Sequence, residues 1–343
     1  MPYHIFHHIF PGRIRLLSWL KLLMLGMSFT VIFTEDYGHM SRVSAGILIP
    51  QLHERTISKG ERFNLGLATG SSPVGLYSLL ARNQHKFDAA KIDTYNLDEY
   101  VGLPGKTPEE RAAHKESYTW FMDENLFGKL DPKFNESHLP PALWIEQSRL
   151  EREIGETPLV GFDGCDCGKA IVIPDNCTND YLAKIKEGMN DYLDRIDQAG
   201  GIDLWVVGVG CRGHIGFHEC GIPLDHNMLL VKLDDNTINK AVFDGHFSSY
   251  EDVPKYALSM GAAGICGKSR KILLLASGEA KAEPIAKSIL GDTTSDVPIS
   301  ILQQFARKEG KDVTYVIDSD AAAGLLGKEQ ALKNKGIILE DWR

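Results

Sequence analysis

The chain has 343 residues, of which 43% are hydrophobic and 24% are charged, and its formal net charge is -9. This length allows one large domain or two ordinary ones, and the acidic balance argues against non-specific binding to nucleic acid. The six cysteines form no C-x-x-C pair and are too sparse for a disulfide scaffold, so a reducing cytoplasm suits the chain better.

The N-terminal stretch, residues 1–26, is basic and apolar. A signal peptide or a membrane anchor is one interpretation, but Lys21 interrupts the apolar run and no clear cleavage site follows. A start of translation at Met27 is the simpler interpretation. We therefore expect residues 1–26 to be an extension outside the fold, and we expect no stable association with a membrane.

From residue 28 onward, short apolar runs alternate with helical patterns. Thr34 is the expected N-cap of the first helix, with Glu35 and Asp36 in its first turn. The runs that predict strands are 28–33, 63–68, 91–100, 201–210, 271–281 and 312–318, and those that predict helices include 34–52, 74–83 and 282–290. This alternation predicts an open, doubly wound, mostly parallel α/β sheet with helices on both faces. We assign residues 27–330 to this single domain and residues 331–343 to a C-terminal tail.

One segment, residues 147–180, breaks the alternation with clustered Gly, Asp and Cys and is interpreted as an insertion at a loop edge. Cys165, Cys167 and Cys177 lie in it. Their C-x-C-x9-C spacing lacks a fourth obvious ligand, so we do not expect a structural zinc ion there.

Polar clusters follow several of the predicted strands, where ligands bind in open parallel sheets. Gly70, Ser71 and Ser72 precede Pro73 at the start of a helix, a pattern that can bind phosphate but also occurs in ordinary strand-to-helix turns. Lys281 could reach a phosphate from another strand end, although a solvated lysine is the commoner case.

Two adjacent acids, Asp98 and Glu99, end another predicted strand. A partly desolvated carboxylate there could act as a general base, and the alternative is a helix-capping or solvated pair.

The stretch "GVGCRGHIGFHECG" (208–221) follows an apolar strand. His214 and Glu219 could form an acid/base pair in it. His214 and His218 could instead share a metal if the loop were helical, but Gly213 and Gly216 disfavour a helix. We therefore expect no metal at these histidines.

Taken together and in this order, the clusters resemble the glucosamine-6-phosphate deaminase (isomerase) family over roughly residues 29 to 325, apart from the insertion. The matching stretches are "LATGSSPVGLY", "YNLDEYVGLP", "SYTWFMDENLF", "GGIDLWVVGVG", "GHIGFHECG", "VPKYALSMGAAGI", "LLLASGEAKAEPIAKSILG" and "DVPISILQQ". The resemblance implies an open α/β fold. It also implies conversion of an amino-sugar 6-phosphate and water into a ketose 6-phosphate and ammonia, without a metal or an organic cofactor. The related 6-phosphogluconolactonases share the sheet and the "GHI" region, but "NLDEY" and "GFHE" look like the deaminases.

The resemblance also implies roles for individual residues. Asp98 would move the proton between C2 and C1 of the sugar, with Glu99 beside it as support. His214 would open the sugar ring, and Glu219 would orient it. The groups that would hold the phosphate are Gly70, Ser71, Ser72 and Lys281.

The sequence departs from the family pattern near the histidine. Arg212, which we group with the catalytic residues, stands where the family has an aspartate, and it could compete for Glu219, turn to solvent or grip phosphate. His218 and Cys220 replace an asparagine and a proline. No arginine precedes "VP", where His246 is a weak substitute.

Three functions remain open after these departures. The first is an active deaminase or isomerase, the second a catalytically impaired sugar-phosphate binder, and the third a lactonase-like enzyme. A homo-oligomer is compatible with each.

Overall fold

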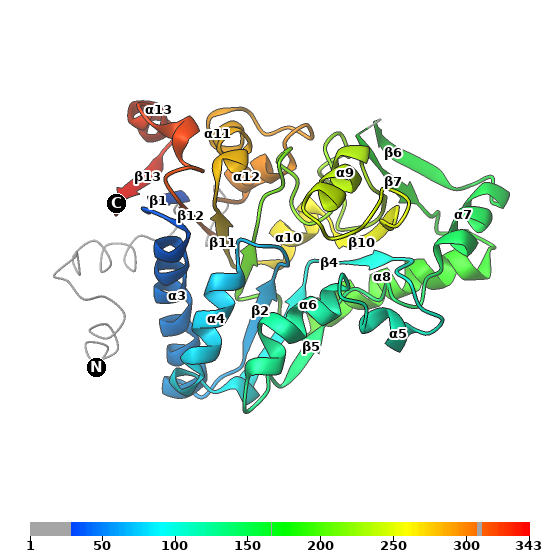
Figure 1. Ribbon diagram of the computed structural model, residues 1–343, viewed down its shortest axis with the longest axis horizontal. Helices are drawn as coiled ribbons and strands as arrows, with labels where there is room; N and C mark the ends of the chain where they lie inside the picture. The colour runs from blue at the N-terminus through cyan, green and yellow to red at the C-terminus, as the bar shows by residue number, and fades with distance from the viewer. Residues whose placement is uncertain (1–28, 166, 307–310) are drawn as a thin grey trace.

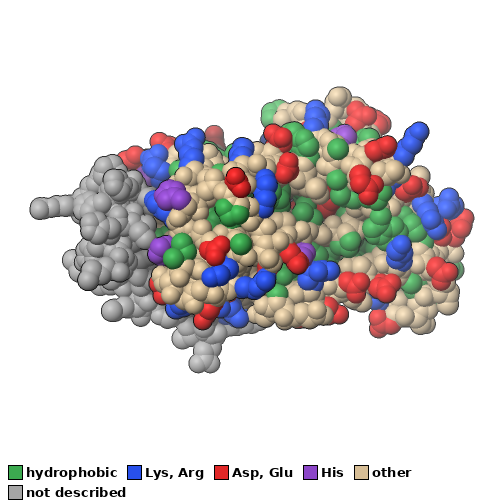
Figure 2. Space-filling model, turned by 90° about the horizontal axis from the view of Figure 1, so that it is seen from below, with side chains coloured by type: hydrophobic (Ala, Val, Ile, Leu, Met, Phe, Trp, Pro, Cys, Tyr) green, Lys and Arg blue, Asp and Glu red, His purple; other side chains and the backbone are tan. Residues whose placement is uncertain are grey.

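The structure, a computed structural model, describes residues 29–165, 167–306 and 311–343 (Figure 1). The expected extension, residues 1–26, and the proposed start at Met27 lie outside these ranges. No helix in the described ranges is both long enough and apolar enough to cross a membrane. Figure 2 shows acidic and basic side chains interspersed over the face seen from below, so this face carries no continuous basic surface for a polyanion.

The main element is an eight-stranded sheet in the order β13-β1-β12-β11-β8-β2-β3-β5, and every neighbouring pair is parallel. This sheet confirms the predicted mostly parallel α/β fold. In that order the strands are Ile337–Asp341, Phe29–Phe33, Asp312–Ile317, Lys271–Ala276, Leu204–Val207, Phe63–Leu67, Ile92–Asn96 and Glu136–His138.

Helices cover both faces of this sheet (Figure 1). Successive residues of β8 show why its sequence is a continuous apolar run: Leu204 and Val206 pack into one core, and Trp205 and Val207 into the other. The first core is completed by α3 (Tyr37–His53), α4 (Val74–Arg82) and α6 (Tyr118–Asn125). The second is completed by α8 (Asp180–Gln198), α10 (Ala262–Lys268), α11 (Ala282–Leu290) and α12 (Leu302–Ala306).

A second sheet, which the sequence analysis did not anticipate, has five antiparallel strands in the order β4-β10-β9-β7-β6. These are Asp98–Val101, Tyr256–Met260, Met228–Lys232, Gly168–Val172 and Gly161–Cys165. The expected single strand over 91–100 is wrong, because the chain changes sheet at Leu97. The Leu97 N–H donates to the Leu67 carbonyl in the main sheet (3.1 Å), and its carbonyl accepts from the Met260 N–H in the second (2.7 Å).

The segment 147–180 is largely regular secondary structure rather than an irregular loop. It forms α7 (Gln147–Glu156) and the β6–β7 hairpin, and β7 pairs with β9 in the second sheet. Leu150 and Ile171 are buried in the main core. The clustered glycines therefore mark turns within an ordered part of the domain.

The two ends of the domain also differ from expectation. Asp36, not Thr34, caps α3, because its Oδ1 accepts from the His39 N–H at 2.7 Å while the Thr34 hydroxyl donates to the Ile317 carbonyl. Residues 331–343 are not a free tail. They contain the end of α13 (Glu329–Asn334) and the strand β13, which pairs with β1 along its whole length.

Candidate active site

The order of strands in the main sheet indicates where a ligand would bind. β2, β3 and β5 follow one another outward from β8 on one side, whereas β11 and β12 follow outward on the other. The order in which successive strands are added to the sheet therefore reverses between β2 and β8, which run parallel. Ligands bind beyond the carboxyl ends of the strands at such a switch point. The segments that follow β2, β8 and β11 carry the "TGSSP", "CRGHIGFHE" and "SGEAK" motifs.

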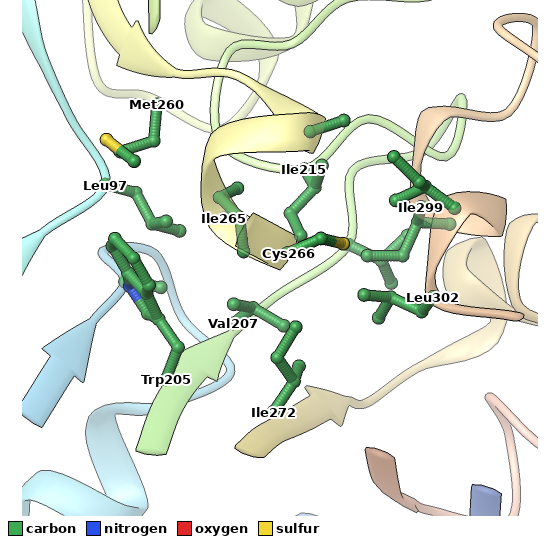
Figure 3. Packing of buried hydrophobic residues seen from close by; sticks show 14 of the residues in the cluster. Leu97, Trp205, Val207, Ile215, Met260, Ile265, Cys266, Ile272, Ile299 and Leu302 are labelled. Carbon is green, nitrogen blue, oxygen red and sulfur yellow. The ribbon is translucent and has the colours of Figure 1, made fainter. Parts of the chain in front are cut away.

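Two of the candidate catalytic residues are fixed by apolar neighbours in the chain. Leu97 directly precedes Asp98, and Ile215 directly follows His214. Both apolar side chains are buried in one cluster that also includes Ile265 of α10 (Figure 3). Both segments thus pack on helix α10 through these apolar side chains.

The Asp98 side chain lies at the start of β4 and is only 5% exposed. Burial, and secondarily the charge of Glu99, raises the pKa of Asp98 from its ordinary value of 3.8 to about 8. The negative charge of Asp98 also raises the pKa of four tyrosines that burial already raises, namely Tyr77, Tyr100, Tyr118 and Tyr192. The carboxyl thus lies among aromatic rings, in surroundings that suit a general base.

The loop that carries His214 passes directly over Asp98. A Cβ atom added to Gly216 would lie 3.2 Å from Asp98 Oδ2 and 2.8 Å from Ser259 Oγ, and Gly216 has a φ of +56°. A side chain at this position would meet both neighbours in a backbone conformation that glycine adopts most easily. The glycine therefore allows close approach of the loop to the buried carboxyl.

The carboxylate of Glu99 lies at the N-terminus of helix α6. It accepts hydrogen bonds there from the N–H groups of Tyr118 and Thr119, both at 3.0 Å, and from the Ser117 hydroxyl at 3.0 Å. Further bonds come from the Tyr100 N–H and the Thr119 hydroxyl. Burial raises the pKa of Glu99, and these hydrogen bonds oppose that shift. These contacts are those of the helix-capping alternative for Glu99.

His214 and Glu219 form the expected pair. His214 Nδ1 lies 3.2 Å from Glu219 Oε2, with the imidazole 22% exposed and the carboxylate 1% exposed. The ring lies against the backbone of Gly210, where an added Cβ would fall 1.8 Å from Nε2. Glycine at 210 is thus required by the position of the imidazole. With Nδ1 on the carboxylate, Nε2 is the ring nitrogen left for a ligand.

Arg212 does not compete for Glu219. Its Nη1 donates to Asp234 Oδ2 at 2.8 Å, and its Nη2 donates to Cys167 Sγ at 3.0 Å. The Asp234 N–H in turn donates to Glu219 Oε1 at 3.4 Å. Two residues, Asp234 and Glu219, therefore separate Arg212 from His214 in this network, and these contacts give no support to its expected place among the catalytic residues.

His218 is fully buried and is held by two backbone groups. Its Nδ1 accepts from the Ala262 N–H at 3.0 Å, and its Nε2 lies 3.1 Å from the Ile222 carbonyl. Burial lowers the pKa of His218 to about 4. Both ring nitrogens are thus used inside the fold, and His218 and His214 do not form a metal pair.

The candidate phosphate groups lie on neighbouring segments. Gly70 has a φ of +97°, Ser71 is exposed, and the Tyr37 hydroxyl donates to the Ser71 carbonyl while accepting from the Gly75 N–H. Lys281 Nζ lies 3.9 Å from Cys211 Sγ, so the segment after β11 contacts the loop after β8. The structure thus orders this strand-to-helix turn and brings Lys281 to the loop that carries His214.

His246 lies elsewhere, with its Nδ1 2.9 Å from Glu116 Oε2. It lines a surface cavity of about 930 Å³ whose walls include Lys106 and His114 but neither Asp98 nor His214. The expectation that His246 replaces a phosphate-binding arginine is not supported by these neighbours.

One residue of the network was missed from the sequence. Asp234 caps α9 (Asp235–Phe243) through its Oδ1, which accepts from the Asn236 N–H at 3.1 Å. A cap position before a helical pattern was its only signal, and that signal says nothing of Arg212 or Glu219, which lie far from it in the sequence.

Comparison with known proteins agrees with this architecture. The family model described as glucosamine-6-phosphate isomerases/6-phosphogluconolactonase matches residues 43–311. Glucosamine-6-phosphate deaminase of Clostridium perfringens strain 13 is 33% identical over 296 residues, which are 85% of this chain and 98% of the relative. The deaminase of Clostridioides difficile strain 630 is 36% identical over 305 residues, 88% of this chain and 99% of the relative.

Solved structures show the same fold. A monomeric glucosamine-6-phosphate deaminase superposes with a TM-score of 0.62 at 27% identity and covers 86% of this chain and 99% of its own. A 6-phosphogluconolactonase from Shewanella baltica superposes with a TM-score of 0.54 at 13% identity, covers 86% and 100% of the two chains, and shares the fold alone. The chain belongs to the family of glucosamine-6-phosphate isomerases and 6-phosphogluconolactonases.

Proposed function

We propose that this protein converts glucosamine 6-phosphate, or a related hexosamine phosphate, and water into fructose 6-phosphate and ammonia. The observation that carries the proposal is the buried carboxyl of Asp98 beneath the glycine loop that presents His214. The deaminase names of the relatives at 33% and 36% identity support it. In this proposal the protein acts in the cytoplasm, in N-acetylglucosamine and amino-sugar catabolism, without a metal or an organic cofactor in the reaction.

The first step is opening of the sugar ring. His214 Nε2 transfers a proton from the C1 hydroxyl to the ring oxygen as the C1–O5 bond breaks and the C1 aldehyde forms. Glu219 holds Nδ1 and stabilises the imidazolium that exists during the transfer. This arrangement follows the logic of a histidine oriented by a buried carboxylate.

The second step moves a proton along the open chain. The Asp98 carboxylate takes the proton from C2 and returns it to C1, while the ammonium nitrogen at C2 gives up one proton and the C1 oxygen gains one, so that a hydroxymethyl group forms at C1 and an iminium group at C2. Water adds to C2, and ammonia and one proton leave to give the ketone. The substrate ammonium group at C2 supplies the positive charge that a buried carboxylate with a pKa of about 8 needs for ionisation at neutral pH. A lactone substrate offers no such cation, and this difference favours an amino sugar.

The phosphate is held away from the reacting carbons by Gly70, Ser71, Ser72 and Lys281 in this proposal. Backbone N–H groups at the start of α4 and the ammonium of Lys281 suit a phosphate dianion. Binding energy from this remote group orients C1 and C2 against His214 and Asp98.

Ammonia release from glucosamine 6-phosphate by the purified full-length protein tests the proposal. We expect turnover by the wild type, a loss of about 10²–10⁴ in kcat for Asp98→Asn, and a raised KM with near-normal kcat for Lys281→Ala. Hydrolysis of 6-phosphogluconolactone without ammonia release from the amino sugar would instead assign the lactonase activity.

A second candidate function is binding of the sugar phosphate without turnover. It is favoured by one observation, that Arg212 rather than an acid stands two residues before His214. Direct titration with glucosamine 6-phosphate separates the two functions, because a silent wild-type protein that still binds the sugar would support the second.

A further inference from the structure

Three metal-ligating side chains meet beside the candidate active site without taking part in the proposed reaction. Cys167 precedes β7, Cys220 directly follows Glu219, and Asp234 caps α9. One ligand atom from each, two sulfurs and a carboxylate oxygen, lie within 4.8 Å of one another. Cys220 is 5% exposed and Asp234 is 4% exposed. These ligands, two buried and one half-buried, come from three separate segments and form a compact and largely preformed cluster.

The positively charged side chain of Arg212 already contacts this cluster. The Arg212 guanidinium donates to Asp234 Oδ2 at 2.8 Å and to Cys167 Sγ at 3.0 Å, so it contacts two of the three ligands. The Arg212 side chain is 41% exposed, whereas that of Asp234 is 4% exposed. The arginine can therefore rotate into solvent without disturbing the core, while the ligands stay in place.

We propose that Cys167, Cys220 and Asp234 form a binding site for a divalent metal ion of the zinc type, and that Arg212 fills this site when the metal is absent. Zn²⁺ binds thiolate sulfur at about 2.3 Å and carboxylate oxygen at about 2.0–2.2 Å. Two ligand atoms of a tetrahedral site are then closer to each other than the 4.8 Å within which these three atoms lie. Water completes the fourth position. Binding releases the two thiol protons to solvent, and the positive charge of the metal replaces that of the displaced guanidinium.

The position of the site ties it to Glu219. Cys220 is the next residue in the chain, and the Asp234 N–H donates to Glu219 Oε1. Gly168, which follows Cys167, packs so closely that an added Cβ would lie 2.6 Å from Glu219 Cβ. A bound metal would therefore clamp the three segments that surround this carboxylate. The inference does not rest on the proposed deaminase reaction, because metal binding is measured without substrate.

Titration of the reduced, chelator-treated full-length protein with Co²⁺ tests the site. We expect a thiolate-to-cobalt charge-transfer band in the near ultraviolet, d–d bands of tetrahedral intensity, and loss of both when Zn²⁺ is added. Cys167→Ser and Cys220→Ser should each remove the charge-transfer band or greatly reduce it. Cys177→Ser, the matched control in the same part of the chain, should retain it, since Cys177 lies against the Asn179 carbonyl.

A variant of Arg212 gives a second test, in which Co²⁺ binding should become tighter and not weaker. Arg212→Gln should tighten Co²⁺ binding by roughly tenfold, since the two hydrogen bonds of the guanidinium no longer compete for the ligands. Absence of a charge-transfer band in the wild type and in Arg212→Gln would overturn the proposal. A charge-transfer band of undiminished intensity in Cys167→Ser would also overturn it, because position 167 is half-buried and serine fits the fold there.

Discussion

Arg212 and Asp234 form an ion pair behind the His214–Glu219 pair, with Arg212 Nη1 2.8 Å from Asp234 Oδ2. Only the backbone N–H of Asp234 reaches Glu219, and the guanidinium has its hydrogen bonds with Asp234 and Cys167. The arginine thus supports the surroundings of Glu219 from outside. Two departures from the family resemblance, Arg212 and Cys220, meet in this one place.

For Arg212→Ala we expect a small effect on turnover, less than about tenfold in kcat/KM, and a stability loss of about 0–1 kcal/mol, because the ion pair is partly exposed. Steady-state ammonia release and urea denaturation measure the two quantities. His214→Gln is the comparison, with an expected loss of about 10²–10⁴ in kcat. A gain of a hundredfold or more in Arg212→Asp would show instead that the arginine impairs catalysis.

For Asp98→Asn we expect an inactive protein that is more stable than the wild type at high pH. The folded pKa of Asp98, about 8, lies above its ordinary value of 3.8. The folded state therefore keeps a proton that the unfolded state gives up, and the wild type loses stability as pH rises between these two values. The asparagine variant lacks this loss.

Urea denaturation of both proteins at pH 5 and pH 8 checks this prediction. The difference in unfolding free energy, variant minus wild type, should increase by on the order of 3 kcal/mol from the lower pH to the higher. An equal difference at the two pH values would mean that Asp98 ionises normally in the folded protein.

The pH dependence of turnover should report the same carboxyl. Because Asp98 must be ionised to accept the C2 proton, kcat/KM should rise with pH and level off near the pKa of about 8. The ammonium group of the bound substrate favours the ionised form, so the rising limb of kcat should lie at lower pH than that of kcat/KM. Ammonia release measured over this range gives both profiles, and a kcat that rises only at higher pH than kcat/KM would contradict the assignment.

Glu99→Gln should affect stability more than substrate binding. The carboxylate accepts four hydrogen bonds from the start of α6 and one from the Tyr100 N–H, whereas glutamine offers one oxygen and turns an N–H₂ group toward donors. We expect a loss of about 1–3 kcal/mol in unfolding free energy and little change in KM. Thermal unfolding and the KM for glucosamine 6-phosphate measure these. A large rise in KM with unchanged stability would restore Glu99 to the substrate site.

The parallel sheet could be predicted because its strands have continuous apolar runs. Strands β2, β8, β11 and β12 are largely buried on both faces, so their apolar runs indicate them. The second sheet could not be predicted in this way. Its edge strand β6, "GFDGC", is half exposed, and β4 begins with two acids, so neither has an apolar run that marks a strand.

The candidate site was predictable only where neighbours in sequence are neighbours in space. His214 and Glu219 are five residues apart and meet as expected. Asp98 and Glu99 are adjacent, yet a strand turns successive side chains to opposite faces, and one of them became a helix cap. The contact of Arg212 with Asp234 and Cys167 joins segments 22 and 45 residues away, and no local pattern encodes it.

The strand β13 has a practical consequence for work with this protein. It supplies the outer partner of β1, whose five residues, Phe29–Phe33, are all buried. A chain shortened to residue 330 would turn that apolar strand into a bare sheet edge, which is a template for pairing with other molecules. We expect such a truncation to aggregate during expression. A tag joined after the exposed Arg343 leaves the pairing of β13 with β1 intact.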